Sequence, residues 1–129
     1  MAHYSSFEDL EIYQKATKFC DDIWDIIVET SLKTDYKLRE QINGSSGSIM
    51  DNIAEGFGRG GNKDFIMFLS FSRGSCCECK AQLLRAKNRN HISETLYSEL
   101  NRKAENLIEQ LSKFMNYLKK SNRKGSKFD

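Results

Sequence analysis

The sequence contains no proline and only 8 glycines among its 129 residues. β-Sandwiches and barrels use both residue types at their many turns, so their scarcity argues against those folds and favours long helices. The longest apolar run, residues 65–69, is far shorter than the roughly 20 residues needed to cross a bilayer, and the N-terminal stretch has no apolar signal-peptide segment. We therefore expect a cytoplasmic protein with no membrane segment and one hydrophobic core.

The net charge is only +2, but the charges are unevenly distributed along the chain. Residues 1–57 carry five basic and eleven acidic side chains, whereas residues 58–90 carry seven basic and two acidic ones. Residues 91–129 carry eight basic and five acidic side chains. This distribution fits either an acidic partner such as nucleic acid or pairing between two parts of the same chain.

Four segments show the period of amphipathic helices. The first three cover residues 7–30, 36–57 and 63–89. The fourth begins after Ile92 with Ser93 as N-cap, and its apolar stripe continues to Leu118. Short connections between helices of this length predict an all-α, antiparallel up-down-up-down four-helix bundle over residues 1–120. Residues 121–129 form a basic tail without periodicity, which we expect to be disordered.

The first and third segments have more apolar surface than one bundle would bury. The first has a wide apolar face, and the start of the third, around residues 65–71, is apolar nearly all round. A helix that is apolar on every side is normally buried on more than one side. We therefore expect the protein to self-associate.

Patterns that would indicate catalysis or metal binding are weak. Cys76 and Cys79 have the C-x2-C spacing of a zinc site, but no second pair follows, and buried thiols in a helical core are the better interpretation. His3 and His91 lie near a terminus and in a connection, and no helix has the Glu-x-x-His pattern of di-iron bundles. The glycine-rich segment 56–62 lacks the pattern of a phosphate-binding loop and is interpreted as a turn. We expect no cofactor, no metal and no enzymatic activity.

A polar stripe follows the second segment beside its apolar face, and polar side chains continue on the third. These residues are Gln41, Ser48, Asn52, Glu55, Ser75 and Glu78. Buried polar layers set helix register and partner choice more often than they catalyse, so we predict that they form a structural, hydrogen-bonded layer.

A basic line on the third segment is the best candidate for a nucleic-acid surface, since Arg73, Lys80 and Lys87 recur every seven residues. Further candidates are Arg59, Lys63, Arg85, Arg89, Lys119 and Lys120. Such a surface would neutralise phosphates without reading sequence and would be sensitive to salt. The alternative is that the basic line pairs with acidic side chains of the first segment, which are Asp21, Asp22 and Asp25. The residues alone favour neither interpretation.

The middle of the chain contains a specific motif. Residues 48–59 read Ser-Ile-Met-Asp-Asn-Ile-Ala-Glu-Gly-Phe-Gly-Arg, with Gln41-Ile42 before it and Phe65, Phe68-Leu69, Gly74-Ser75 and Glu78 after it. Together with Phe7-Glu8-Asp9-Leu10 and Tyr13-Gln14-Lys15-Ala16, this motif resembles a bacterial four-helix-bundle family. The family is named after proteins encoded in intervening sequences of large-subunit ribosomal RNA, and is also called the S23 ribosomal protein family. The similarity covers residues 7–118.

The resemblance implies a cytoplasmic bundle without enzymatic activity that assembles into a ring, commonly a homopentamer. Relatives include the accessory subunit of diversity-generating retroelements, a basic barrel that binds a reverse transcriptase and nucleic acid. The signature polar residues that the resemblance implies are Ser48, Asn52, Glu55, Arg59, Ser75 and Glu78, with a structural role. The chain departs from the family at residues 42–47, where the usual arginines and alanines are replaced by Ile-Asn-Gly-Ser-Ser-Gly, and this weakens the inference of nucleic-acid binding.

Two functions follow as hypotheses. The first is a ring-forming bundle whose basic surface binds RNA or DNA, together with a protein partner. The alternative is an oligomeric protein-protein interaction scaffold whose charges are paired internally. Basic residues left free of carboxylates would favour the first, and basic residues held in ion pairs would favour the second.

Overall fold

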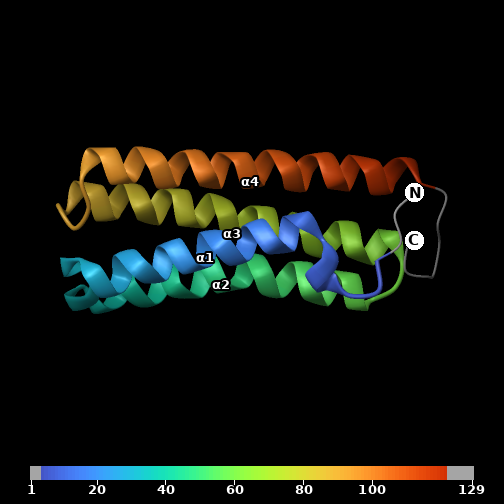
Figure 1. Ribbon diagram of the computed structural model, residues 1–129, viewed down its shortest axis with the longest axis horizontal. Helices are drawn as coiled ribbons and strands as arrows, with labels where there is room; N and C mark the ends of the chain where they lie inside the picture. The colour runs from blue at the N-terminus through green and yellow to red at the C-terminus, as the bar shows by residue number, and fades with distance from the viewer. Residues whose placement is uncertain (1–3, 122–129) are drawn as a thin grey trace.

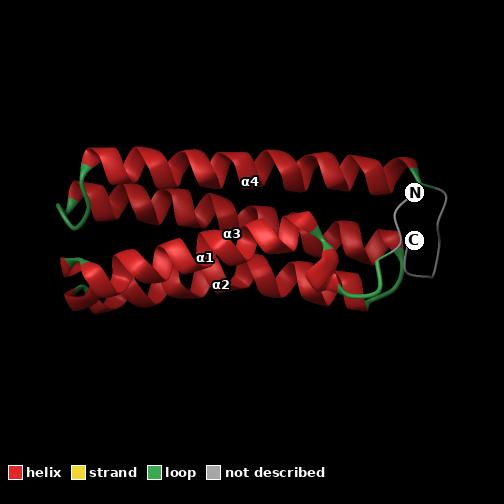
Figure 2. Cartoon of the chain, in the orientation of Figure 1, coloured by secondary structure: helices red, strands yellow, loops and turns green. Residues whose placement is uncertain are grey.

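Four long helices make up most of the protein, and the computed structural model describes residues 4–121. In chain order the helices are α1 (Glu11–Glu29), α2 (Tyr36–Gly58), α3 (Asn62–Asn88) and α4 (Glu94–Lys120). Each helix runs antiparallel to the one before it, so α1 and α3 point in the same direction (Figure 1). The described residues contain no strand (Figure 2), and the predicted all-α four-helix bundle is confirmed. The predicted basic tail lies, apart from Ser121, outside the described residues.

The first helix begins later than the sequence pattern predicts. Phe7–Asp9 form a separate 3₁₀ turn, η1, in which Ser6 and Asp9 cap each other's backbone in a capping box. Leu10 then adopts an extended conformation, and α1 begins only at Glu11. The predicted start at residue 7 is therefore wrong, because the reciprocal cap closes the turn before the helix.

The connection between α2 and α3 is a short turn, as the glycine-rich sequence predicts. Gly60 has a φ of +97°, a left-handed conformation that side chains disfavour. Gly56, in the last turns of α2, lies directly against α3, because a Cβ atom at this position would be only 2.7 Å from Cβ of Phe68. The two glycines thus serve different purposes, one for the turn and one for the close approach of two helices.

The helices surround one core in the order α1, α2, α3, α4. α3 packs extensively against α2 and α4, whereas α1 packs against α2 and less closely against α4. α1 and α3 therefore lie diagonally across the core from each other. Large, fully buried side chains of this core include Ile23, Ile42, Ile53, Leu69, Leu83 and Leu111. None of the helices between residues 4 and 121 is both long and apolar enough to span a membrane.

Candidate interaction surfaces

The predicted basic line of α3 is paired with α4. Its contacts are Arg73 Nη1 to Ser112 Oγ at 3.0 Å, Lys80 Nζ to Glu105 Oε2 at 3.1 Å and Lys87 Nζ to Glu94 Oε2 at 3.2 Å. The alternative partners proposed on the first helix, Asp21, Asp22 and Asp25, are therefore wrong, because α1 lies across the core from α3. The basic residues are thus paired within the chain, as the alternative interpretation expects, but their partners lie on α4 and not on α1.

Three other predicted basic residues also have polar partners. These contacts are Arg59 to Glu55 at 2.7 Å, Arg85 to Gln41 at 2.9 Å and Arg89 to Asp35 at 2.8 Å. The guanidinium of Arg59 also lies 4.9 Å from the centre of the Phe68 ring. Six of the nine predicted residues are thus engaged within the chain.

The remaining three predicted basic residues, Lys63, Lys119 and Lys120, are exposed and have no hydrogen bond or ion pair with any described residue. They lie at the same end of the bundle, because Asn62 Nδ2 donates a hydrogen bond to the backbone oxygen of Leu118 at 3.1 Å. This bond joins the start of α3 to the last turn of α4. We call the three lysines the basic end.

The predicted polar layer does not form one layer within the single chain. Glu55 and Glu78 are exposed, and only Ser75 is buried. Asn52 Nδ2 donates to the backbone oxygen of Ser48 at 2.8 Å, and among residues 4–121 this is the one hydrogen bond that joins two of the six. The prediction is wrong for the single chain, because the stripe follows the flank of α2 and reaches solvent at both ends.

Other polar side chains occupy the buried positions between helices. They are Ser45, Ser46, Asn62, Ser72 and Gln82, in addition to Ser75. Ser72 Oγ donates to the backbone oxygen of Ile49 at 2.8 Å and so joins α3 to α2. Most of these side chains are small, which permits the close approach of α2 and α3.

Cys76 and Cys79 are buried in the core, as the sequence predicts for apolar thiols. Burial raises the pKa of the Cys76 thiol to about 12 and raises that of Cys79 as well. No group of three metal-ligating side chains occurs in the described part of the chain. The C-x2-C spacing here places two small side chains on the inner face of α3.

The outer face of α3 exposes apolar and small side chains along much of its length, with the charged residues Glu78 and Arg85 among them. Met67, Phe71 and Leu84 are 43%, 50% and 41% exposed. Gly74, Cys77 and Ala81 are also exposed and lie between them on the same face. This face fulfils the expectation of an apolar surface larger than one bundle buries, although it extends well beyond the first two turns of the helix.

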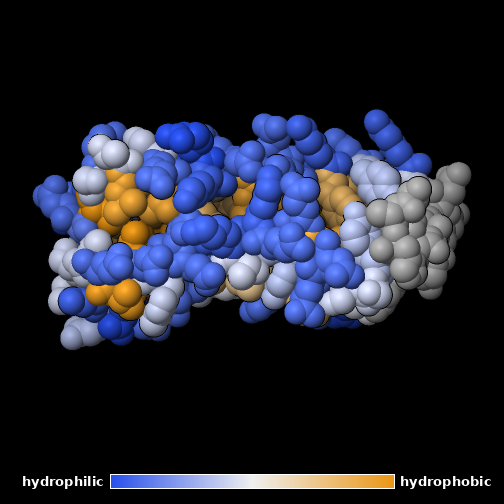
Figure 3. Space-filling model, in the orientation of Figure 1, coloured by the Kyte–Doolittle hydropathy of each residue, from blue (hydrophilic) through white to orange (hydrophobic). Residues whose placement is uncertain are grey.

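A groove follows the contact between α1 and α4, where the helices pack least closely. It contains three hollows of about 380, 370 and 210 Å³. The space-filling view shows apolar patches between the polar side chains of this face, the largest near the end where α1 ends and α4 begins (Figure 3). The groove is thus a row of pockets rather than a continuous channel.

The three hollows differ in chemistry. The first, which we call the aromatic hollow, is lined by Tyr4, Ile12, Phe114 and Tyr117 among others. The second, the basic hollow, is lined by Lys15, Lys18, Arg102 and Lys103 around Phe19 and Leu107, with Asp22 as its one carboxylate. The third, the acidic hollow, is lined by Asp22, Asp25, Glu29 and Glu99, with Lys103 as its one cation.

The cations of the basic hollow are not among the basic residues that the sequence predicts for an interaction surface. They lie on both flanks of ordinary apolar stripes, where charged residues are expected on any surface helix. Two helices must be placed side by side before Lys15 and Lys18 meet Arg102 and Lys103. The one sequence signal was the pair of adjacent cations at 102–103.

Asp22 lies where the basic and acidic hollows meet and joins α1 to α4. Its carboxylate contacts Lys18 Nζ at 2.7 Å and Lys103 Nζ at 2.8 Å. Burial raises the pKa of Asp22, but the hydrogen bonds from Lys103 and Lys18 outweigh it and leave the pKa below its ordinary value. The carboxylate is therefore ionised and holds the two lysines at the centre of the groove.

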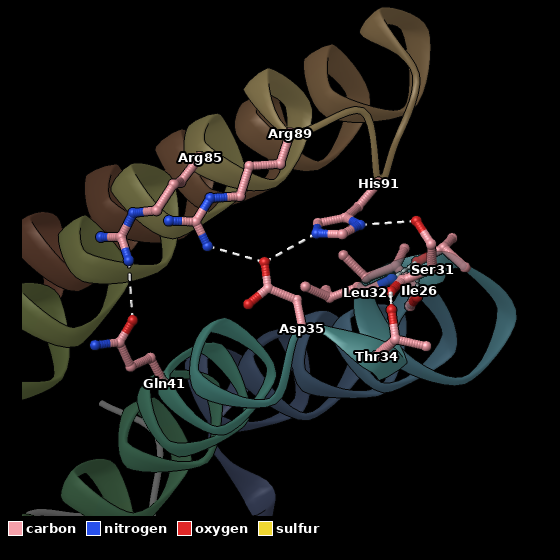
Figure 4. A network of polar contacts seen from close by, with 10 residues as sticks. Ile26, Ser31, Leu32, Thr34, Asp35, Gln41, Arg85, Arg89 and His91 are labelled. Carbon is pink, nitrogen blue, oxygen red and sulfur yellow. Dashed lines mark hydrogen bonds and ion pairs between the residues drawn. The ribbon is translucent and has the colours of Figure 1, made fainter.

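At one end of the bundle, polar contacts join the α1–α2 connection to the α3–α4 connection (Figure 4). Ser31 Oγ lies 2.7 Å from His91 Nδ1, and His91 Nε2 lies 2.9 Å from Asp35 Oδ2, which also accepts from Arg89. Serine hydrolases also place a His between Ser and Asp, but there Ser faces Nε2 and Asp faces Nδ1, whereas here the two nitrogens are exchanged. Arg89 also shares the carboxylate, and none of the three hollows reaches Ser31. We call these four residues the loop clasp and assign it a structural role.

Comparison with known proteins agrees with this fold. The chain resembles the crystal structure of a protein of unknown function from the S23 ribosomal protein family of Bacteroides thetaiotaomicron, with a TM-score of 0.73 and 20% sequence identity. The similarity covers 81% of this chain and 97% of that one. No curated protein matches the chain. Residues 8–113 match the family model described as 23S rRNA-intervening sequence protein, and the chain belongs to this family.

Proposed function

We propose that the protein is a non-enzymatic cytoplasmic scaffold that assembles with copies of itself into a ring, five-fold as the family resemblance implies, and presents its surface to a protein partner. The observation that carries this proposal is the outer face of α3. Six apolar or small residues lie exposed on it over almost five turns, and no other part of the described chain covers them. Exposed apolar surface of this extent marks interaction sites in soluble proteins.

The internal pairing of basic residues supports a scaffold in preference to a nucleic-acid-binding surface on α3. Arg73, Lys80 and Lys87 are held by side chains of α4. A phosphate would have to compete with these partners, so each contact would contribute less than a free lysine does. Protein association through the apolar face requires no such competition.

Light scattering on the purified full chain at micromolar concentration tests the proposal. We expect a mass that is a multiple of 14.9 kDa. Phe71→Glu, which places a charge at the most exposed of the three large apolar side chains of this face, is expected to lower the mass towards that of the single chain. Tyr36→Glu, at an exposed aromatic residue on α2, is the control and should leave the mass unchanged. A natural chain with a mass of 14.9 kDa at this concentration would overturn the proposal.

A second candidate function is binding of RNA or DNA at the basic end. Lys63, Lys119 and Lys120 are the predicted basic residues that have no partner in residues 4–121. In a ring these lysines would recur once per copy, and a modest cluster would gain avidity. This function is compatible with the scaffold, because it uses the end of the bundle and leaves the outer face of α3 free.

A further inference from the structure

We infer that the outer face of α3 in one copy packs into the α1–α4 groove of the next copy, with Phe71 in the aromatic hollow, Glu78 in the basic hollow and Arg85 in the acidic hollow. This inference rests on the proposed self-assembly and names the two surfaces that meet. The partner is a second copy of this chain, and the contact is head-to-tail because the two surfaces are different.

The spacing of the two surfaces agrees. Phe71, Glu78 and Arg85 follow one another every seven residues on α3, are all exposed, and lie on one line of the helix about 10.5 Å apart. The hollows involve α1 at residues 10–12, 15–22 and 22–29, whose centres are also about seven residues apart. A helix laid parallel to α1 would therefore bring all three side chains to a hollow at once.

The aromatic hollow suits Phe71. It is about 380 Å³ in volume and is lined by three aromatic side chains, those of Tyr4, Phe114 and Tyr117. Phe114 and Tyr117 are stacked, with ring centres 5.7 Å apart. A half-exposed phenylalanine ring would gain both apolar burial and aromatic contacts in this hollow.

The basic hollow suits Glu78. Four cations line it against the one carboxylate of Asp22, and Arg102 has no hydrogen bond or ion pair with any described residue. Glu78 is exposed and likewise has no hydrogen bond or ion pair within residues 4–121. Lys15, Lys18 and Lys103 are already in ion pairs within the chain, so the unpaired carboxylate of Glu78 on one surface meets the unpaired guanidinium of Arg102 on the other.

The acidic hollow suits Arg85. Asp25 and Glu29 line it, are exposed, and have no ion pair among the described residues. Among residues 4–121, Arg85 is bound only by the neutral side chain of Gln41, at 2.9 Å (Figure 4). Its guanidinium can therefore turn to a carboxylate of the next copy without breaking an ion pair.

The chemistry also sets the direction of the contact. If α3 lay antiparallel to α1, Glu78 would keep its place, but Arg85 would enter the aromatic hollow and Phe71 the acidic one. The reversed arrangement would lose both the pairing of Arg85 with carboxylates and the burial of Phe71 among aromatic rings, so the parallel arrangement is favoured.

Ion pairs within the single chain indicate that the head-to-tail contact closes into a ring. Lys80 of α3 pairs with Glu105 of α4, and Asp22 of α1 pairs with Lys103 of α4. Because α4 is antiparallel to both helices, Gln82, two residues beyond Lys80, lies level with Lys103 and hence with Asp22. Along the bundle axis, each residue of α3 thus lies at the same height as the residue of α1 whose number is 60 lower.

Residues 71, 78 and 85 therefore lie, within their own chain, at the levels of residues 11, 18 and 25, which are the levels of the hollows. Successive copies would be related by rotation without a shift along the helix axis. Because α3 adjoins α4, the outer face of α3 and the α1–α4 groove do not point in opposite directions. Each copy is therefore rotated relative to the one before it, always in the same sense. Head-to-tail contacts with rotation and no rise close into a ring instead of a filament.

A charge-reversal experiment tests this register. Glu78→Lys and Arg102→Glu, each made in the full chain, are expected to weaken assembly at least tenfold in concentration, measured by sedimentation velocity. The double variant should recover much of the loss. An equimolar mixture of the two single variants should assemble better than either alone, because each supplies the surface that the other needs. Asp51→Lys, at an exposed carboxylate of α2 with no ion pair among residues 4–121, is the control.

Each outcome decides between the hypotheses. If the natural chain assembles and both single variants behave like the Asp51→Lys control, the register is wrong while self-assembly stands. If the single variants dissociate but neither the double variant nor the mixture recovers, residues 78 and 102 do not meet, and the register is again wrong. A natural chain that remains single overturns both the register and the proposed function. Neither Glu78 nor Arg102 has a polar partner in the described chain, so at a concentration too low for assembly the variants and the natural chain should have the same melting temperature.

Discussion

His91 Nε2 lies 2.9 Å from Oδ2 of Asp35 and fastens the α3–α4 connection to the start of α2. Because a carboxylate only accepts, Nε2 carries the hydrogen, and Nδ1 faces the hydroxyl of Ser31. Arg89 donates to the same oxygen of Asp35. One carboxylate thus organises two connections that are more than fifty residues apart in sequence.

Replacement of Asp35 by alanine is expected to lower the melting temperature by roughly 5 °C, since a hydrogen-bonded ion pair of this kind contributes about 1–2 kcal/mol. Asp51→Ala removes an exposed carboxylate that has no ion pair with the described residues, and is expected to change the melting temperature by less than about 2 °C. Equal melting temperatures for the two variants would show that the loop clasp does not stabilise the fold.

Acid is expected to destabilise the protein through Asp22 and Asp35. Hydrogen bonds from His91 and then Arg89 lower the pKa of Asp35, and the lysine contacts lower that of Asp22, relative to the ordinary value of 3.8. The unfolded chain therefore takes up these protons at higher pH than the native chain does. Their contribution is complete above the ordinary pKa and is lost as the pH falls through the lowered native values. Urea titrations from pH 6 to pH 2 should show a shallower decline for the Asp22→Asn, Asp35→Asn double variant.

Gly56→Ala is expected to reduce the free energy of unfolding by about 1–3 kcal/mol, because the new Cβ would lie 2.7 Å from Cβ of Phe68 and 2.9 Å from Cδ1 of Phe65. Gly47→Ala is the matched control in the same helix. No atom lies within 4 Å of a Cβ at Gly47, so the change should stabilise the protein by up to about 1 kcal/mol. Chemical denaturation of both variants measures the contrast, and the same sign for both would contradict the close approach of α2 and α3.

Any binding of nucleic acid is expected to depend on the basic end. A Lys119→Gln, Lys120→Gln variant should bind a labelled RNA or DNA strand at least tenfold more weakly, regardless of sequence. The matched control is Lys33→Gln, Lys37→Gln, which removes two exposed lysines near the loop clasp, at the other end of the bundle. If about six phosphates are neutralised, affinity should fall roughly a thousandfold between 50 and 200 mM salt. Absence of binding at 50 mM salt would leave the scaffold as the sole proposal.

The thiols of α3 are expected to react very unequally. Cys77 is exposed, whereas Cys76 and Cys79 are buried and burial raises the pKa of both. Since the thiolate is the reactive form, a thiol reagent at pH 8, used at a concentration too low for assembly to cover the outer face of α3, should modify Cys77 more than tenfold faster than either neighbour. The difference should disappear in denaturant, and mass spectrometry of the modified peptides identifies the sites.

The helices and their inward faces could be predicted from sequence because apolar residues recur with the helical period. The start of the first helix could not, because Ser6 and Asp9 form a cap whose effect on Leu10 depends on local geometry that the period does not describe. The turn at Gly60 was predictable from its glycines, whereas the close contact at Gly56 required α3 to be in place.

The candidate site was less predictable, because periodicity identifies a face of a helix but not its neighbour. Arg73, Lys80 and Lys87 were recognised as one line, yet their partners on α4 depend on the order of helices around the core. Glu78 was expected in a buried layer and is exposed, since only the assembled bundle shows which side of α3 points outward. The basic hollow combines residues from the first and last helices and has no local signature.

The loose contact between α1 and α4 also bears on how the bundle opens. α2, α3 and α4 are consecutive and pack closely, so they form a unit of local contacts that folds early and opens last. Detachment of α1 breaks less packing contact than detachment of α3 would, so the amide hydrogens of α1 should exchange before those of α3. A second copy seated in the groove would hold α1 in place, and assembly would then suppress this opening and make the melting temperature rise with protein concentration.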